Sequence, residues 1–580
     1  MVVYQVFTRL FGNKVNANIP GGTLEQNGSA KMNDIDAKVL RFVRYMGVTH
    51  VWYTGVVRHA TETDYSAYGI PRQHPDIVKG KAGSPYAIAD YYDVDPDLAE
   101  DVNRRMEEFE ALVERTHQAG MKVIIDFVPN HVARQYQSIC KPKGVKDLGE
   151  DDNPDMGFSP HNNFYYCTGQ PFVSPEVPST YQEFPAKATG NDCFGNAPSQ
   201  NDWYETVKLN YGVDYMAGES PLTSHLGGEQ RGIGSCSSPL GGDKRGASTW
   251  HQMLDILLFW AAKGIDGFRC DMVFMVPLDF WRWAIPQVKA QYPDLSFIGE
   301  IYDPAIYRSF ISSGFDYLYD KVGMYDCIRD ITCGYRRAAD ITWQWQATDD
   351  IRNHMLYFLE NHDEQRIASD FFAGDARKGI PGVLVSALFG RNPFMFYAGQ
   401  ELGERGMDRE GFSGRDGRTT IFDYWHVESL DHGYFHRRKL TTDEKALMLE
   451  YQKILLLKER EKALSLGDTF DLMYVNQHIG NRLFAFLRKY GKELMLVVAN
   501  FSDEEVETDV NIPRHAMEVM DIPEGDHTAT DLLGDEKTAF CLQADGALHI
   551  TVAPWYGRVY KIVRTSHASK KTSNPALSEQ

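Results

Sequence analysis

The strongest constraint on the fold of this chain is a set of four charged segments that stand at the ends of apolar runs. The segments begin at Asp126, Gly267, Gly299 and Glu360, and apolar runs at 123–125, 297–298 and 355–359 precede the first, third and fourth. Runs of this length are typical of buried strands. In a (β/α)8 barrel the carboxyl ends of all strands converge on one face. We therefore expect Asp271, Glu300 and Asp363 to meet in one pocket although they are far apart in the chain.

Alternating strand and helix patterns support the barrel. Helices are predicted at 36–46, 104–119, 250–263 and 278–292, between apolar strand candidates. The alternation stops between 133 and 246, in a stretch rich in Gly, Pro, Ser and Asn. A structureless loop of that length is improbable in a compact domain and indicates an inserted subdomain. After about residue 466, short strand candidates separated by turn residues replace the helix signal and indicate an all-β domain.

These patterns predict an α/β fold with a (β/α)8 TIM barrel, a subdomain inserted after strand 3 and a C-terminal all-β domain. The predicted domains are a catalytic barrel at 1–132 and 247–465, an inserted domain at 133–246, a β-sandwich domain at 466–564 and a polar tail at 565–580. Such alternation of strands and helices implies a mainly parallel sheet.

Bulk composition excludes several kinds of partner. The chain has 580 residues and a formal net charge of −20, which would repel a nucleic acid. It has no apolar stretch long enough to span a bilayer.

The eight cysteines show no metal or redox spacing, so we expect no disulfide framework. The first residues read as a strand and lack a signal-peptide pattern, so we expect a cytoplasmic protein, or an exported one whose signal has been removed. The oligomeric state is not indicated.

The charged segments carry residues suited to cleaving a glycosidic bond, which needs a proton donor and a second carboxylate. Arg269 and Asp271 are two residues apart on a strand and should face the same way. We expect the positive charge of Arg269 to lower the pKa of Asp271 and keep this nucleophile ionised. Glu300 stands near two other carboxylates, which should raise its pKa and suit a general acid and base. Asp363 would then brace the distorted sugar.

The four segments resemble the conserved regions of glycoside hydrolase family 13, the alpha-amylase family, and the likeness spans nearly the whole chain. The resemblance implies cleavage of α-1,4-glucosidic bonds, with retention, in starch-like glucans or maltooligosaccharides. It implies that Asp271 is the nucleophile, Glu300 the acid/base and Asp363 the transition-state stabiliser. It also implies that the sugar is contacted by Tyr86, His131, Arg269 and His362.

The resemblance leaves the presence of calcium open. Asn130 matches a calcium ligand of the family, but Lys208 falls where many calcium-binding members carry an Asp. A lysine there resembles the neopullulanase and cyclomaltodextrinase group, although the amino-terminal domain usual in that group is not seen. The two alternatives are a Ca²⁺ ion beside Asn130, or a weakened or absent site in which the Lys208 ammonium supplies the charge. No organic cofactor is implied.

Other functions compete with hydrolysis of α-glucans. An α-glucosidase or an α-glucan transglycosylase would have the same fold and the same carboxylates. A non-catalytic amylase-like barrel is disfavoured because all three carboxylates are present. A barrel enzyme for phosphorylated metabolites is disfavoured because no Gly-rich phosphate loop follows the late strands.

Overall fold

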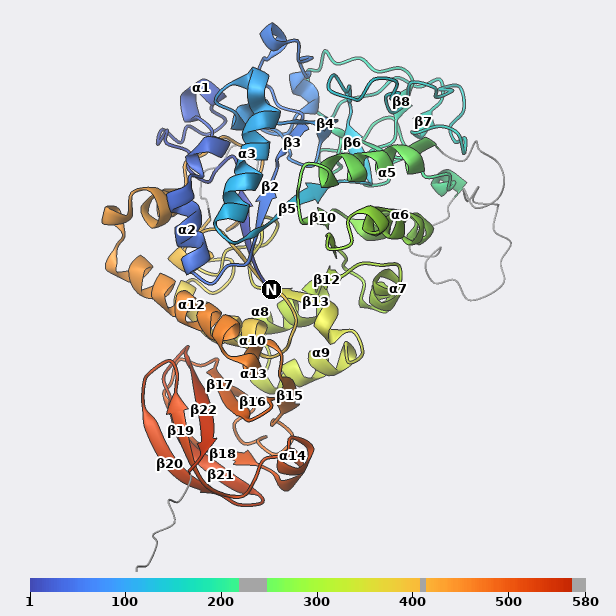
Figure 1. Cartoon of the computed structure of the whole chain (residues 1–580). Helices are drawn as coiled ribbons and strands as arrows, with labels where there is room; N and C mark the ends of the chain where they lie inside the picture. The colour runs from blue at the N-terminus through green and yellow to red at the C-terminus, as the bar shows by residue number, and fades with distance from the viewer. Residues whose placement is uncertain (218–247, 407–413, 566–580) are drawn as a thin grey trace, which may run out of the picture.

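The computed structural model describes residues 1–217, 248–406 and 414–565. Within these ranges eight parallel strands close into a barrel in the order β1-β14-β13-β12-β11-β10-β5-β2. The strands are β1 (Val2–Phe7), β2 (His50–Thr54), β5 (Lys122–Phe127), β10 (Gly267–Cys270), β11 (Ser296–Gly299), β12 (Tyr317–Tyr319), β13 (Met355–Phe358) and β14 (Phe394–Tyr397). The predicted (β/α)8 barrel is therefore confirmed, and Figure 1 shows it surrounded by its helices.

The barrel strands are buried on both faces, which explains their continuous apolar sequences. Every residue of β1 and β10 is buried, and so are the last five residues of β5. Strand β10 ends at Cys270 and β11 ends at Gly299. Asp271 and Glu300 follow them directly, and their backbone N–H groups still donate to carbonyls of the neighbouring strands. The backbones of both residues are thus fixed to the end of the barrel, which positions their carboxylates.

Most of the helices that cover the barrel bury one face and expose the other, whereas every residue of α10 is buried. The longer ones are α2 (Ala37–Tyr45), α3 (Arg105–Gln118), α5 (Ser248–Ala261), α6 (Leu278–Gln291), α10 (Ile380–Leu388) and α12 (Thr442–Arg460), and the shorter ones α7 (Tyr307–Ser312), α8 (Asp326–Thr332) and α9 (Ile341–Ala347). Helix α12 begins with a capping box in which Thr441 and Glu444 satisfy each other's backbone N–H groups. It ends at Arg460, and a short helix α13 (Lys462–Ser465) follows.

Two long connections extend from the barrel next to each other. After β2 the chain forms an antiparallel pair, β3 (Val57–His59) and β4 (Ile88–Val94). After β5 comes the insertion, whose short strands are β6 (His131–Ala133), β7 (Tyr166–Cys167), β8 (Ala186–Lys187) and β9 (Thr206–Lys208). Strand β6 pairs with β9, which brings the end of the insertion back to its start. The insertion stands at one side of the barrel (Figure 1, upper right), and its portion from 218 to 246 lies outside the described residues.

The C-terminal part is a separate, strand-rich unit below the barrel in Figure 1. Its six-stranded sheet has the order β15-β16-β17-β22-β19-β20, and β18 pairs with β21. These strands are β15 (Asp468–Asp471), β16 (Leu483–Tyr490), β17 (Glu493–Asn500), β18 (Val506–Ile512), β19 (Gly525–Asp531), β20 (Lys537–Leu542), β21 (Gly546–Val552) and β22 (Gly557–Arg564). A short helix, α14 (Arg514–Val519), interrupts the predicted all-β pattern. The predicted polar tail lies outside the described residues from 566 onward.

Two findings bear on the environment of the chain. In the described ranges, no helix combines the length and the apolar character needed to cross a membrane. The seven cysteines in the same ranges are free thiols.

Candidate active site

A cavity of about 300 Å³ lies at the carboxyl-terminal ends of the barrel strands. Among the side chains that line it are five of the predicted site residues: Tyr86, His131, Asp271, Glu300 and Asp363. The first two come from the connections after β2 and β5, and the carboxylates follow β10, β11 and β13. The structure therefore brings together side chains that are up to 277 positions apart, because parallel strands end on one face of the barrel.

The guanidinium of Arg269 contacts the acidic groups of the site. Its side chain is almost fully buried, with Nη1 2.6 Å from Oδ1 of Asp271 and Nη2 2.8 Å from Oε2 of Glu300. Asp126 lies on β5, and its Oδ1 is 3.8 Å from the same Nη1. One guanidinium thus partly neutralises three carboxylates, because its planar fork offers several donors at once. Arg269 contacts the carboxylates and is not among the residues that line the cavity, and its predicted contact with the sugar stays a prediction.

The pKa of Asp271 differs from the prediction. Burial raises this pKa above its ordinary value, and Arg269 opposes the shift without cancelling it. Arg269 lowers this pKa as expected, but the expectation omitted desolvation, which disfavours the charged form of an enclosed carboxylate and makes the net shift upward. The short hydrogen bond from Arg269 still orients the carboxylate.

Glu300 is held by two donors besides Arg269. Its Oε2 accepts a 2.9 Å hydrogen bond from the backbone N–H of Met272, and its Oε1 accepts one of 2.5 Å from the hydroxyl of Tyr302. Burial raises the pKa of Glu300 to about 7, with further repulsion from Asp271 and Asp363. The predicted direction of the shift is confirmed, but burial is its largest cause. A carboxyl group with this pKa can give up and regain a proton near neutral pH.

Asp363 differs electrostatically from the other two carboxylates. Burial raises its pKa, but the adjacent His362, whose Nε2 is 3.0 Å from Oδ2, together with Arg269 and Arg418 more than offsets this, and the pKa falls to about 2. The ring of His362 stacks on that of Tyr86 at 5.2 Å, and its Nδ1 is 2.7 Å from Nε2 of Gln5 on β1. The three carboxylates of one cavity therefore have different affinities for a proton, which separates their chemical roles.

His131 faces the cavity from the start of β6. Burial and the nearby Lys208 lower its pKa to about 3, so the imidazole is neutral and can exchange hydrogen bonds with hydroxyl groups. Its ring lies 5.2 Å from that of Trp203, which also lines the cavity. The wall on this side is therefore made by the insertion.

Asn130, the predicted calcium ligand, contacts a lysine. The ammonium of Lys208 is 2.7 Å from Oδ1 of Asn130 and 2.6 Å from Oδ1 of Asp192. Calcium needs six to eight oxygen ligands at 2.3–2.6 Å. These residues do not fit a Ca²⁺ ion, because the two side-chain oxygens already face a positively charged nitrogen that would repel it.

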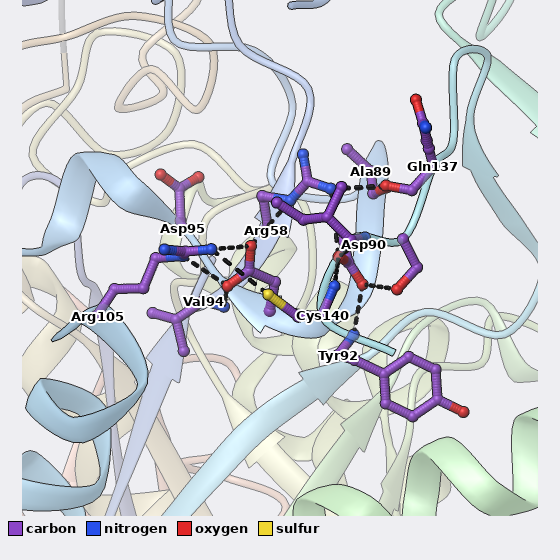
Figure 2. Close-up of polar contacts among 12 residues, drawn as sticks. Arg58, Ala89, Asp90, Tyr92, Val94, Asp95, Arg105, Gln137 and Cys140 are labelled. Atoms are coloured by element: carbon purple, nitrogen blue, oxygen red, sulfur yellow. Dashed lines mark hydrogen bonds and ion pairs between the residues drawn. The ribbon is translucent and has the colours of Figure 1, made fainter. Parts of the chain in front are cut away.

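A second group of acidic side chains has the spacing of metal ligands. In the described part of the chain, Asp90, Asp93 and Cys140 offer ligand atoms within 4.8 Å of one another. Figure 2 shows Arg58 and Arg105 directed at this group. Arg105 forms a fork with Asp93 at 2.6 and 2.8 Å, and Arg58 lies 3.3 Å from Asp90. The negative charges are therefore already neutralised, and the group is a buried ion-pair network.

Several cavity residues were missed by the sequence reasoning. They include Lys79, Glu205, Tyr302 and Phe422. Tyr302 could have been found, because it stands two residues after Glu300 at a strand end. The others lie in irregular segments whose course no periodicity reveals.

Comparisons with known proteins agree with this architecture. Residues 5–188 match the model of the alpha amylase catalytic domain, and residues 476–557 match that of the maltogenic amylase C-terminal domain. The chain is 24% identical over 405 residues to alpha-amylase 3 of Dictyoglomus thermophilum, covering 66% of this chain and 68% of that one. It is 22% identical over 576 residues to neopullulanase 2 of Thermoactinomyces vulgaris, covering 96% of this chain and 77% of the relative.

Solved structures with the same fold include a maltogenic alpha-amylase from Thermotoga neapolitana, with a TM-score of 0.61, 19% identity and coverage of 97% of this chain and 99% of that one. An alpha-amylase from Geobacillus thermoleovorans gives a TM-score of 0.62 at 18% identity, covering 97% and 98%. Fold and site together define a (β/α)8-barrel glycoside hydrolase. Its matched regions and relatives make the chain similar to members of glycoside hydrolase family 13, the alpha-amylase family, with features like those of neopullulanases.

Proposed function

We propose that this enzyme hydrolyses α-1,4-glucosidic bonds of starch-like glucans or maltooligosaccharides with retention of configuration. The observation that carries the proposal is the placement of Asp271, Glu300 and Asp363 around one cavity, with Arg269 bridging the first two. Retaining glycosidases need a nucleophile and an acid/base on either side of the scissile bond.

In the proposed reaction, protonated Glu300 gives its proton to the glycosidic oxygen while a carboxylate oxygen of Asp271 attacks the anomeric carbon. The bond between that carbon and the leaving oxygen breaks, and a covalent glycosyl–Asp271 ester forms. Ionised Glu300 then takes a proton from water, and the hydroxide equivalent attacks the same carbon. This step releases Asp271 and returns the proton to Glu300, so the two displacements restore the original configuration.

The remaining predicted residues would act on the bound sugar or on the carboxylates that surround it. The low pKa of Asp363 keeps a negative charge beside the cavity, which favours the positive character of the oxocarbenium-like transition state. Tyr86 offers a ring face to the sugar, and His131 offers a neutral ring nitrogen to its hydroxyls. Arg269 and His362 would act through the carboxylates they contact.

The choice of α-glucan as substrate draws on the relatives. The matched relatives are named as an alpha-amylase and a neopullulanase, and solved neighbours are described in complex with acarbose, maltose or maltotriose. An uncharged sugar is also compatible with a cavity lined by aromatic rings and hydrogen-bonding groups.

A product analysis tests the proposal. The protein is incubated separately with starch, pullulan, a cyclodextrin and maltotriose, and the size and initial anomer of the products are followed by chromatography and NMR. We expect glucose or short maltooligosaccharides, with the α-anomer appearing first. An initial β-anomer would exclude retention, and transfer products from maltotriose without hydrolysis would favour a transglycosylase.

We also propose that the Lys208 ammonium takes the place of a calcium ion beside Asn130. Its hydrogen bond to Asn130 and its ion pair with Asp192 support this assignment. No step of the proposed reaction involves a metal.

A further inference from the structure

Two chain segments meet across one side of the cavity rim. The first runs from Lys79 to Ser84, between β3 and β4, and the second is Ile421–Phe422, after β14. The backbone N–H of Ala82 donates a 3.0 Å hydrogen bond to the carbonyl of Phe422. A Cβ atom on Gly80 would lie 2.2 Å from the same carbonyl oxygen. The two backbones are therefore in direct contact, with no room for a side chain or a sugar between them.

Arg9, just after β1, locks this contact. Its guanidinium donates to the carbonyls of Ala82, Gly83 and Ile421 at 2.7, 3.2 and 2.7 Å. The side chain of Arg9 is almost fully buried. Several charge-assisted hydrogen bonds from one rigid group hold both segments in place more firmly than neutral contacts would.

The other end of the first segment is joined to the insertion. The Lys79 ammonium donates a 3.1 Å hydrogen bond to the carbonyl of Asp202 and lies 3.1 Å from a carboxylate oxygen of Glu205. Lys79 and Glu205 both line the cavity. We call residues 202–205, 79–84 and 421–422 the rim arc, because these contacts make it continuous.

The rim arc stands opposite the proposed acid. It is built by connections that follow β5, β2 and β14, and Arg9 follows β1. In the closed barrel β11 is four strands from β1 in either direction. Glu300 and Tyr302 follow β11, so the leaving group that Glu300 protonates lies on that side. The sugar on the non-reducing side of the scissile bond then points toward the rim arc.

We propose that the rim arc closes the non-reducing side of the site, so that the enzyme acts on the free non-reducing ends of α-glucan chains and releases short products. A chain interior could not pass through the contact between Ala82 and Phe422. A cavity of about 300 Å³ lies at the lower limit for ligand pockets, which suits a terminal unit of few sugar rings. Lys79 and Glu205 offer polar groups to the terminal hydroxyls. The inference rests on the proposed α-glucan cleavage.

A pair of matched substrates tests it on the wild-type protein. One is maltoheptaose labelled at its reducing end, and the other is the same compound with an ethylidene group blocking O4 and O6 of the non-reducing glucose. We expect the unblocked compound to shorten from its unlabelled end. The blocked compound should react at least about 100-fold more slowly, because misplacing a substrate in the site costs a rate factor of this size. Similar rates with internal cleavage would overturn exo action while leaving hydrolysis intact. No turnover of either would overturn the proposed function and this inference with it.

A variant tests whether the rim arc causes the preference. Arg9→Met removes the guanidinium that joins the segments, and we expect the ratio of unblocked to blocked rates to fall. Arg41→Met, at an exposed position on α2, is the matched control and should keep the wild-type ratio. A folded Arg9→Met protein, judged by its melting temperature, whose ratio equals that of the control would contradict the role of the rim arc.

Discussion

The ammonium nitrogen of Lys208 donates a 2.7 Å hydrogen bond to Oδ1 of Asn130, and both side chains are almost fully buried. Lys208 belongs to β9, at the end of the described insertion strands, and Asn130 directly precedes β6. The contact therefore ties the insertion to the barrel at the point where the chain leaves β5. A side-chain cation can do this permanently, because it cannot dissociate as a metal ion can.

Replacement of Lys208 should destabilise this junction without creating a need for metal. Lys208→Met leaves Asp192 and Asn130 without their buried donor, and we expect a loss of about 3 kcal/mol in the free energy of unfolding. Lys146→Met, at an exposed ion pair of the same insertion, should change stability by less than about 1 kcal/mol. Denaturant titration measures both. A wild-type protein that loses stability in EDTA and regains it with Ca²⁺ would contradict the assignment.

Asp271→Asn should abolish turnover while preserving the fold. The amide has nearly the shape of the carboxylate but cannot form the glycosyl ester, so we expect kcat to fall at least about 10⁴-fold. Steady-state rates on starch and the melting temperature are the measurements. Asp279→Asn on the exposed face of α6 serves as a control and should remain active. Near wild-type hydrolysis by Asp271→Asn would remove it as the nucleophile.

Glu300→Gln should separate acid catalysis from the rest of the mechanism. The glutamine cannot donate a proton to the leaving oxygen, and we expect kcat on maltooligosaccharides to fall about 10²–10⁴-fold. An α-glucosyl fluoride needs no such proton, so its first displacement should be much less affected. The test compares the two substrates on the same preparation. An equal loss on both would argue against the acid role.

The pH dependence of kcat/KM should report the two carboxyl groups of the reaction. Glu300 must be protonated to act as the acid, so activity should fall as the pH rises through about 7. Asp271 must be ionised, so activity should also fall on the acid side, through a pKa that burial raises above its ordinary value. Initial rates across the pH range should therefore give a bell-shaped profile. A profile that stays flat well above neutral pH would not fit Glu300 as the acid.

Tyr302→Phe should move the alkaline side of this profile. The hydroxyl of Tyr302 donates to Glu300 and favours its ionised form, so its removal should raise the pKa of Glu300. We expect the alkaline limb to shift upward by about one pH unit, from the size of a hydrogen bond to a charged group. Tyr335→Phe, at a highly exposed position, is the control. A simple loss of rate without a shift would mean that Tyr302 acts only by packing.

Sequence reasoning predicted the barrel and its charged strand ends because these depend on local patterns. The apolar runs before Asp126, Glu300 and Glu360 are continuous in sequence, and parallel strands can end on one face only. It failed at Asp271, whose pKa is raised by burial, because the depth of burial depends on everything packed around the side chain. The predicted sugar contacts of Arg269 and His362 remain predictions, and the structure adds that each of these side chains contacts a carboxylate of the site.

The sequence alone determined the class of fold and the residue types available for chemistry. Apolar strand runs and the charged residues that follow them are local patterns, so each can be recognised within a short segment of the chain. Only the tertiary structure decided how the site is enclosed. Arg9, Ala82 and Phe422 are separated by up to 413 positions and meet through backbone carbonyls that carry no residue-specific signal. Contacts of this kind depend on how irregular segments fold back over the barrel, and that is settled by packing and hydrogen bonding across the whole molecule.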